Sequence, residues 1–110
     1  MSMALEGEAI QVARLDEIPN RGMKSVRVGG REVLLCRLDG RVFALPSRCT
    51  HRGAPLIDGR LEGPFLRCPW HGVKFDVRTG VRVCVPDCVD LRVTRARVID
   101  ETVWLPAPNA

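Results

Sequence analysis

Two short cysteine–histidine pairs constrain this chain more than any other feature. The first pair is Cys49-x-His51 and the second is Cys68-x-x-His71, with the sixteen residues 52–67 between them. His51 and His71 are the only histidines in the sequence. Thiolate sulfur and imidazole nitrogen are ligands that proteins offer to iron and zinc. Two loops that each bring one sulfur and one nitrogen to the same point would build a four-ligand metal site.

The residues around both pairs resemble those of Rieske iron–sulfur proteins. Gly53 and Leu56 follow the first pair, and Pro69 and Gly72 surround the second. The stretch 74–80, Lys-Phe-Asp-Val-Arg-Thr-Gly, resembles the Phe-Asp-x-x-Thr-Gly hairpin of that family, and residues 85–86 fall where the family has a proline-containing loop over the cluster. The resemblance covers residues 8 to 105, which is nearly the whole chain.

This resemblance implies a Rieske-type [2Fe–2S] cluster, one per chain. In the family two cysteines hold one iron and two histidines hold the other. The matching residues here are Cys49 and Cys68 for the inner iron and His51 and His71 for the outer iron. The implied function is that of a ferredoxin, a one-electron carrier and not an enzyme. Its implied partners are an NAD(P)H-dependent flavoprotein reductase and the terminal oxygenase of a ring-hydroxylating system.

Three other interpretations remain open at this stage. In the simplest interpretation, the four residues are ordinary packed or hydrogen-bonded side chains. A Cys₂His₂ zinc site is the chemical competitor, although zinc sites more often place both sulfurs in one loop. The resemblance also admits the small Rieske-like subunit of an assimilatory nitrite reductase, but members of that group often lack some of the ligands.

The respiratory branch of the family differs at four positions. It has an extra cysteine in each ligand loop, and these cysteines form a disulfide, whereas this chain has Ala54 and Trp70 there. It also has serine and tyrosine hydroxyls that donate to the cluster, whereas this chain has Val73 and Phe75. Hydrogen bonds to cluster sulfurs raise the reduction potential. The sequence therefore predicts a potential near the low end of the Rieske range, roughly −150 mV.

Short apolar runs separated by turn residues predict an all-β fold, an antiparallel sandwich or barrel of Rieske type with a cluster-binding subdomain inserted as two loops. Gly29-Gly30 and Asp39-Gly40 are typical of two-residue hairpin turns. One helical turn is expected at 16–18. The expected strands are 9–14, 24–28, 32–37, 41–45, 61–62, 65–67, 74–76, 81–83, 91–99 and 102–105.

The length of 110 residues fits one domain, residues 1–110, with the cluster-binding subdomain at about 46–87 and loose tails at 1–7 and 106–110. No run approaches the ~20 apolar residues of a membrane helix, and residues 1–8 do not read as a signal peptide. We therefore expect a soluble cytoplasmic protein, without a membrane partner and monomeric.

The composition leaves two further questions. The net charge is +4, but the arginines are spread along the chain and Tyr is absent, so a solvated basic surface is favoured over a nucleic-acid interface. A basic rim near the ligands would favour an acidic docking partner. Of the five cysteines, Cys36, Cys84 and Cys88 are not ligands, and all three are expected to be structural thiols in a reducing cytosol.

Overall fold

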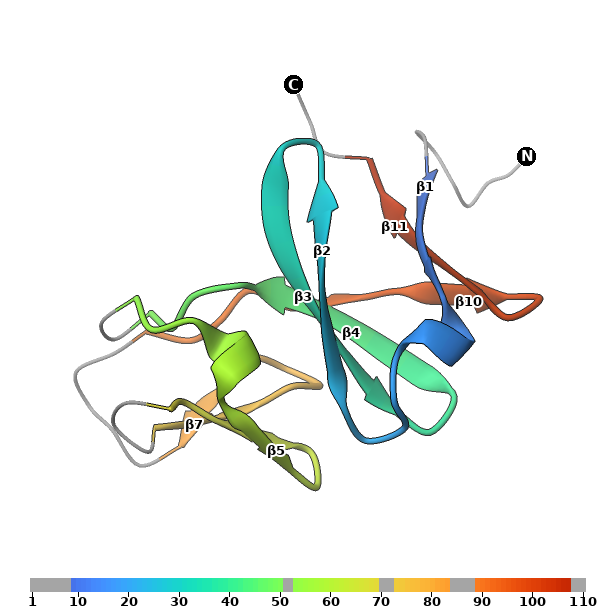
Figure 1. Ribbon diagram of the computed structural model, residues 1–110. Coiled ribbons are helices and arrows are strands. Elements are labelled where there is room, and N and C mark those ends of the chain that lie inside the picture. The colour runs from blue at the N-terminus through green and yellow to red at the C-terminus, as the bar shows by residue number, and fades with distance from the viewer. Residues whose placement is uncertain (1–8, 51–52, 70–72, 84–88, 108–110) are drawn as a thin grey trace.

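The computed structural model describes residues 9–50, 53–69, 73–83 and 89–107. Within these ranges the chain forms three antiparallel sheets with the strand orders β1-β11-β10, β2-β3-β4-β9 and β5-β6-β7-β8 (Figure 1). Two short 3-10 helices, η1 and η2, are the only helical elements of the described residues. The bounds are β1 (Ala9–Arg14), η1 (Leu15–Glu17), β2 (Met23–Val28), β3 (Arg31–Leu38), β4 (Arg41–Pro46), η2 (Leu56–Asp58), β5 (Arg60–Glu62), β6 (Phe65–Arg67), β7 (Lys74–Asp76), β8 (Arg82–Val83), β9 (Thr94–Arg95), β10 (Arg97–Ile99) and β11 (Thr102–Pro106). This architecture confirms the predicted fold class.

The β2–β3–β4 sheet is the middle layer of the molecule. Side chains on a strand point alternately to opposite faces, and β3 buries both of its faces. Leu34 and Cys36 pack into one core, which also holds the two cysteines of the ligand pairs. Leu35, from the opposite face of β3, packs into a second core with residues of β1 and β11. The continuous apolar run in β3 therefore serves two cores.

The sheet β5–β8 is inserted in the chain between β4 and β9. It lies at one end of the molecule, while β1, β10 and β11 lie at the other (Figure 1). Its hairpins are in simple register, with Arg60 opposite Arg67 in β5–β6 and Arg67 opposite Lys74 in β6–β7. The inserted unit is thus a small sheet of its own, and the two ligand loops lie before β5 and between β6 and β7.

Residues 91–99 do not form the single strand that the sequence predicted, so this prediction is wrong. The chain forms β9, which pairs with β4, and then β10, which pairs with β11 in a different sheet. Ala96 lies between them and donates its backbone N–H to Val42 O at 2.9 Å. Alternation of apolar and polar residues is the same whether successive residues bind one sheet or two, so the pattern alone does not reveal the crossing.

The two ends of the described chain are tied together. β1 pairs with β11, and Ala9 lies opposite Pro106, so Pro106 is the last strand residue and not part of a loose tail as expected. Proline is tolerated here because β10 pairs with β11 only at residues 102–104, so Pro106 has a partner strand on one side only. No helix of the described residues is long and apolar enough to cross a membrane.

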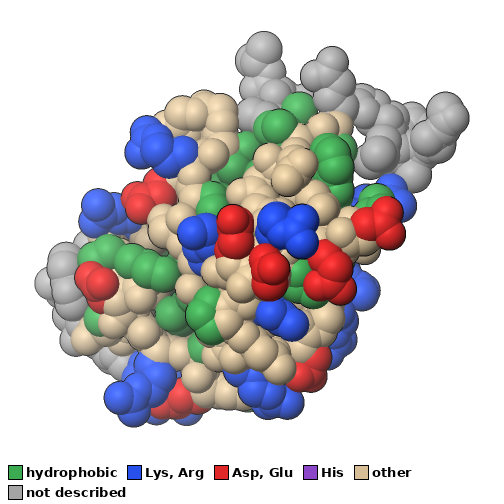
Figure 2. Space-filling model, turned by 45° about the vertical axis from the view of Figure 1, so that its right-hand side comes forward, with side chains coloured by type: hydrophobic (Ala, Val, Ile, Leu, Met, Phe, Trp, Pro, Cys, Tyr) green, Lys and Arg blue, Asp and Glu red, His purple; other side chains and the backbone are tan. Residues whose placement is uncertain are grey.

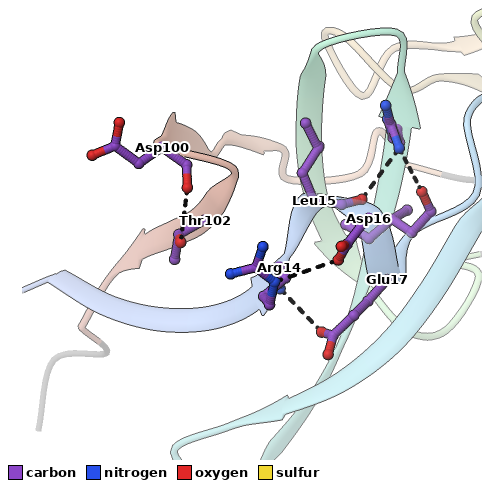
Figure 3. A network of polar contacts seen from close by, with 8 residues as sticks. Arg14, Leu15, Asp16, Glu17, Asp100 and Thr102 are labelled. Atoms are coloured by element: carbon purple, nitrogen blue, oxygen red, sulfur yellow. Dashed lines mark hydrogen bonds and ion pairs between the residues drawn. The ribbon is translucent and has the colours of Figure 1, made fainter.

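The predicted helical turn is confirmed, one residue earlier than expected. It is η1, which follows β1 directly. The Arg14 backbone N–H donates to Glu17 Oε1 at 3.0 Å, and the Arg14 guanidinium pairs with Asp16 at 3.5 Å (Figure 3). From β3, Arg37 donates to the carbonyls of Leu15 and Ile18 at 3.2 and 2.9 Å. The turn is therefore held from both sides, at the end of the molecule away from the ligand loops.

Candidate metal centre

Both ligand loops are closed by the same backbone hydrogen bond. The Cys49 N–H donates to Ala54 O at 2.9 Å, and the Cys68 N–H donates to Val73 O at 2.7 Å. Each cysteine thus binds the carbonyl five residues later, although the histidine is two residues on in one loop and three in the other. The closing bond brings the two ends of each loop together with the cysteine at its base.

Different neighbours support the two loops. The first is bordered by an isolated bridge between Arg48 and Pro55, and Gly53 adopts a φ of +74° that favours glycine. The Gly53 N–H donates to Cys49 O at 2.8 Å, and Arg48 Nη1 donates to Gly53 O at 3.0 Å. The second loop is the connection of the β6–β7 hairpin, which ends at the pair Arg67 and Lys74. Strand pairing holds the second loop, and local turns hold the first.

The two cysteines lie in one core. Cys49 is 3% exposed and Cys68 is 1% exposed, and both pack with the fully buried Leu66 and Phe75. His51 and His71 lie outside the described residues, so the four-ligand site stays a prediction. Two buried sulfurs at the bases of two closed loops fit the inner iron of a [2Fe–2S] cluster, because thiolate ligands are kept from water there.

The buried positions beside the cysteines carry no hydroxyl. Ala54 is fully buried where the respiratory branch has a disulfide cysteine, and Val73 and Phe75 are also buried. None of these three side chains offers a hydrogen-bond donor. These three buried side chains therefore offer the two sulfurs no hydroxyl donor, which is the feature on which the low predicted potential depends.

A chain of hydrogen bonds links the two ligand loops through residues 89–91. In the first loop the Thr50 hydroxyl donates to Val89 O at 2.6 Å. Two residues on, the Leu91 N–H donates to Gly80 O at 2.8 Å, and the Gly80 N–H donates to Asp76 O at 2.6 Å. Asp76 ends β7, the strand that follows the second loop. Sequence reasoning did not single out Thr50, because its partner is 39 residues away.

The Phe-Asp-x-x-Thr-Gly stretch is a turn whose polar residues bind the turn itself. Asp76 accepts from the Arg78 backbone N–H at 2.9 Å and from its guanidinium at 2.9 and 2.8 Å. The Thr79 hydroxyl accepts from the Val81 N–H at 3.2 Å. These bonds to Arg78 hold the pKa of the Asp76 carboxyl below its usual value. The motif is therefore explained by turn structure.

The two cations beside the second loop share one carboxylate. Arg67 and Lys74 both pair with Glu62, at 3.2 and 3.6 Å. The hydrogen bond from Arg67 is the main cause that lowers the pKa of Glu62. On the face in Figure 2, Lys and Arg side chains are likewise interspersed with Asp and Glu. The expected basic rim is thus not a uniform positive surface among the described residues.

Of the three cysteines that are not proposed ligands, only Cys36 lies among the described residues. Cys36 is fully buried in β3, and burial raises the pKa of its thiol to about 12. The burial confirms the prediction of a small core residue. A thiol with a raised pKa is protonated and inert at neutral pH. Cys84 and Cys88 lie outside the described residues, so their role as structural thiols stays a prediction.

Comparisons with known proteins agree with the geometry. Residues 8–95 match the Rieske [2Fe-2S] domain. The chain is 36% identical over 96 residues to the ferredoxin component of naphthalene 1,2-dioxygenase/salicylate 5-hydroxylase systems from Ralstonia sp, covering 87% of this chain and 92% of that protein. The ferredoxin of carbazole 1,9a-dioxygenase from Nocardioides aromaticivorans IC177 superposes with a TM-score of 0.84 at 27% identity, covering 93% and 100% of the two chains.

A solved complex is also similar. A chain in the complex of reduced oxygenase and oxidized ferredoxin in carbazole 1,9a-dioxygenase has a TM-score of 0.81 and 28% identity, and the match covers 93% of this chain and 95% of that one. These matches support an iron–sulfur cofactor over zinc. They give no support to the alternative of a small nitrite reductase subunit.

Proposed function

Because this chain belongs to the Rieske [2Fe–2S] family and is a ferredoxin rather than a catalytic enzyme, we propose that it carries single electrons from an NAD(P)H-dependent flavoprotein reductase to a terminal ring-hydroxylating oxygenase. The observation that carries the proposal is the pair of buried cysteines in one core, each at the base of a closed loop that contains a histidine in sequence. The ferredoxin of the similar complex occurs with an oxygenase, which supports that partner here.

This role requires a bound cluster, and the proposal assigns four residues to hold it. Cys49 and Cys68 hold the inner iron through thiolate sulfur, and His51 and His71 hold the outer iron through imidazole nitrogen. The cluster, when bound, supplies one-electron redox chemistry at a potential that its surroundings set. The buried side chains of Val73 and Phe75 exclude water from the sulfurs and offer them no donor. The chain itself then holds the ligands in place and performs no bond-making step.

The proposed cell location and assembly are simple. The protein acts in the cytoplasm as a monomer, where its reductase and oxygenase partners bind it in turn. The similarity to ferredoxin components of multi-protein systems supports this arrangement, since such a carrier exchanges partners. An electron carrier of this kind needs weak, short-lived complexes, which are typical of redox partners.

The ligand assignment is tested by iron content and colour. Cys49→Ala and Cys68→Ala variants are expected to lose the visible absorption and the bound iron. Cys36→Ala is the matched control, because Cys36 is buried in the same core and is not a proposed ligand. Loss of iron from the control to the same extent would contradict the assignment.

The electron-transfer role is tested by mixing the holo-protein with the reductase and oxygenase from the same genome. NAD(P)H and catalytic reductase should bleach the oxidised visible bands. Addition of oxygenase with an aromatic substrate and oxygen should then restore them. A protein that dithionite reduces but the reductase does not would refute the proposed donor. Reduced protein that the oxygenase leaves reduced would refute the proposed acceptor.

A further inference from the structure

A groove with a volume of about 490 Å³ opens between the ends of β3, β4 and β11. Its floor is apolar and includes Val28, Ala44 and Leu105, which are buried residues of the core between the β1–β11–β10 and β2–β3–β4–β9 sheets. Pro46 and Pro106 line the sides. The groove is thus the open end of the two packed sheets, where the apolar interior meets solvent.

Three arginines surround this apolar floor. Arg31, Arg48 and Arg92 all line the groove and are all exposed. None of them takes part in an ion pair among the described residues. Glu32 is the only acidic residue of the lining, and its carboxylate accepts the Ser25 hydroxyl at 2.8 Å. The three guanidinium groups outnumber the single carboxylate of Glu32, so the groove carries an excess of positive charge.

Three cations of the β5–β8 sheet differ from the arginines of the groove, because each forms an ion pair. Arg67 and Lys74 share Glu62, and Arg82 pairs with Asp90 at 3.0 Å. Because paired cations attract a further anion less strongly, the groove, which holds three arginines unpaired within the described chain beside an apolar floor, suits an anionic group better than these paired cations do. Arg48 Nη1 does bind Gly53 O, but a neutral carbonyl leaves its charge in place.

We propose that this groove docks an acidic segment of a redox partner protein, one that carries both carboxylate and apolar side chains. The apolar side chains would lie on the floor formed by Val28, Ala44 and Leu105, and the carboxylates would pair with Arg31 and Arg92. Complementary charge gives such a contact its orientation and speeds the encounter. The apolar floor supplies the area that the contact buries.

The position of the groove suits electron transfer. Arg48 lines it and directly precedes Cys49, the first proposed ligand. A segment that lies in the groove would therefore hold the rest of the partner beside the first ligand loop. The inference deepens the proposed function and rests on it for the identity of the partner, but its test measures binding and not electron transfer.

Two other occupants fit less well. A second copy of this chain also carries a net charge of +4, which opposes a contact through a positive groove. A small free carboxylate would bury little of its surface, because the groove is open to solvent and ligand pockets usually enclose most of a small ligand. An extended protein segment matches an open groove with charges along its sides.

The test uses the holo-protein and a fluorescein-tagged peptide that alternates glutamate with leucine. Fluorescence anisotropy at low salt should detect binding, and amide signals of Val33, Ala44 and Leu105 should shift in NMR spectra of the ¹⁵N-enriched protein. The double variant Arg31→Gln/Arg92→Gln should weaken binding about five-fold or more, as expected for two exposed ion pairs. The same peptide with glutamine in place of glutamate should bind more weakly than the acidic one.

The matched control is Arg41→Gln/Arg97→Gln, which removes the same charge from exposed arginines that do not line the groove. It should leave binding within about two-fold of the wild type, since it removes no direct ion pair. Equal weakening by both double variants would overturn the proposal, because binding would then follow net charge alone. The proposal would also be overturned if the peptide did not bind, or if it shifted amide signals outside the groove. Binding of hexanoate as tight as that of the peptide would overturn it as well. All variants should keep the visible spectrum of the cluster, which separates this result from any failure of the electron-transfer role.

Discussion

Replacing Gly80 by alanine tests the link between the two ligand loops. Gly80 has a φ of +84°, and a Cβ atom there would lie 1.9 Å from Leu91 O and 2.9 Å from Leu91 C. Real Cβ atoms do not approach backbone so closely, so the segment containing Leu91 would have to move away. That movement would break the 2.8 Å hydrogen bond from the Leu91 N–H to Gly80 O.

Gly30→Ala is the matched control. Gly30 has nearly the same φ, +83°, but a Cβ atom added there would meet nothing within 4 Å. The left-handed conformation costs an alanine about 1–2 kcal/mol at either position. The lost hydrogen bond adds about 0.5–1.5 kcal/mol at Gly80 only. Gly80→Ala should therefore destabilise the fold by about 2–3 kcal/mol, clearly more than Gly30→Ala.

The assay is the midpoint of thermal unfolding of the holo-protein, followed by visible absorption at one heating rate. A loss of 1 kcal/mol lowers the midpoint of a domain near this size by about 4–8 °C. We expect a decrease of about 10–20 °C for Gly80→Ala and about half of that for Gly30→Ala. Equal decreases for both variants would refute the reasoning, because the close approach to Leu91 would then have no effect.

Three further predictions concern the same region. Thr50→Val, which removes the hydroxyl bonded to Val89 O, should speed cluster loss in denaturant by several-fold, whereas Thr50→Ser should behave like the wild type; equal rates would exclude a role for the bond. The lowered pKa of Asp76 contributes stability that is present above about pH 4 and is lost as pH falls through the folded-state value. The unfolding midpoints of wild type and Asp76→Asn should therefore differ at pH 7 and converge below about pH 4; a constant difference would contradict the Arg78 pairing as the cause. In a redox titration the midpoint should lie near roughly −150 mV and fall at alkaline pH, and a value above about +100 mV would contradict the reasoning from the missing hydroxyl donors at Val73 and Phe75.

Local chemistry made much of the fold predictable from sequence. Gly29-Gly30 and Asp39-Gly40 marked two hairpins because few other residues adopt the positive φ that such turns need, and Gly29, Gly30 and Asp39 do adopt it. Strands 9–14, 65–67 and 74–76 have the expected bounds. The crossing between sheets at Ala96 was missed, because the choice of sheet depends on partners far away in sequence.

The candidate site was predictable in its residue types and not in its supports. The four ligands stay a prediction from the spacing of cysteines and histidines, and the structure buries Cys49 and Cys68 in one core. The contact of Thr50 with Val89 and the ion pair of Lys74 with Glu62 could not be predicted, because each joins segments through side-chain positions that only packing sets. The two histidines lie outside the described residues, and their role as ligands stays a prediction.

The most direct test of the electron-transfer role is an absorption spectrum of the freshly purified protein, followed by EPR after dithionite reduction. We predict a red-brown protein whose reduced EPR signal has an average g value clearly below that of [2Fe–2S] proteins with four cysteine ligands, because the proposed site gives one iron two histidine ligands. A colourless protein with stoichiometric zinc, even from anaerobic cells supplied with iron, would contradict the electron-transfer role and leave only the fold.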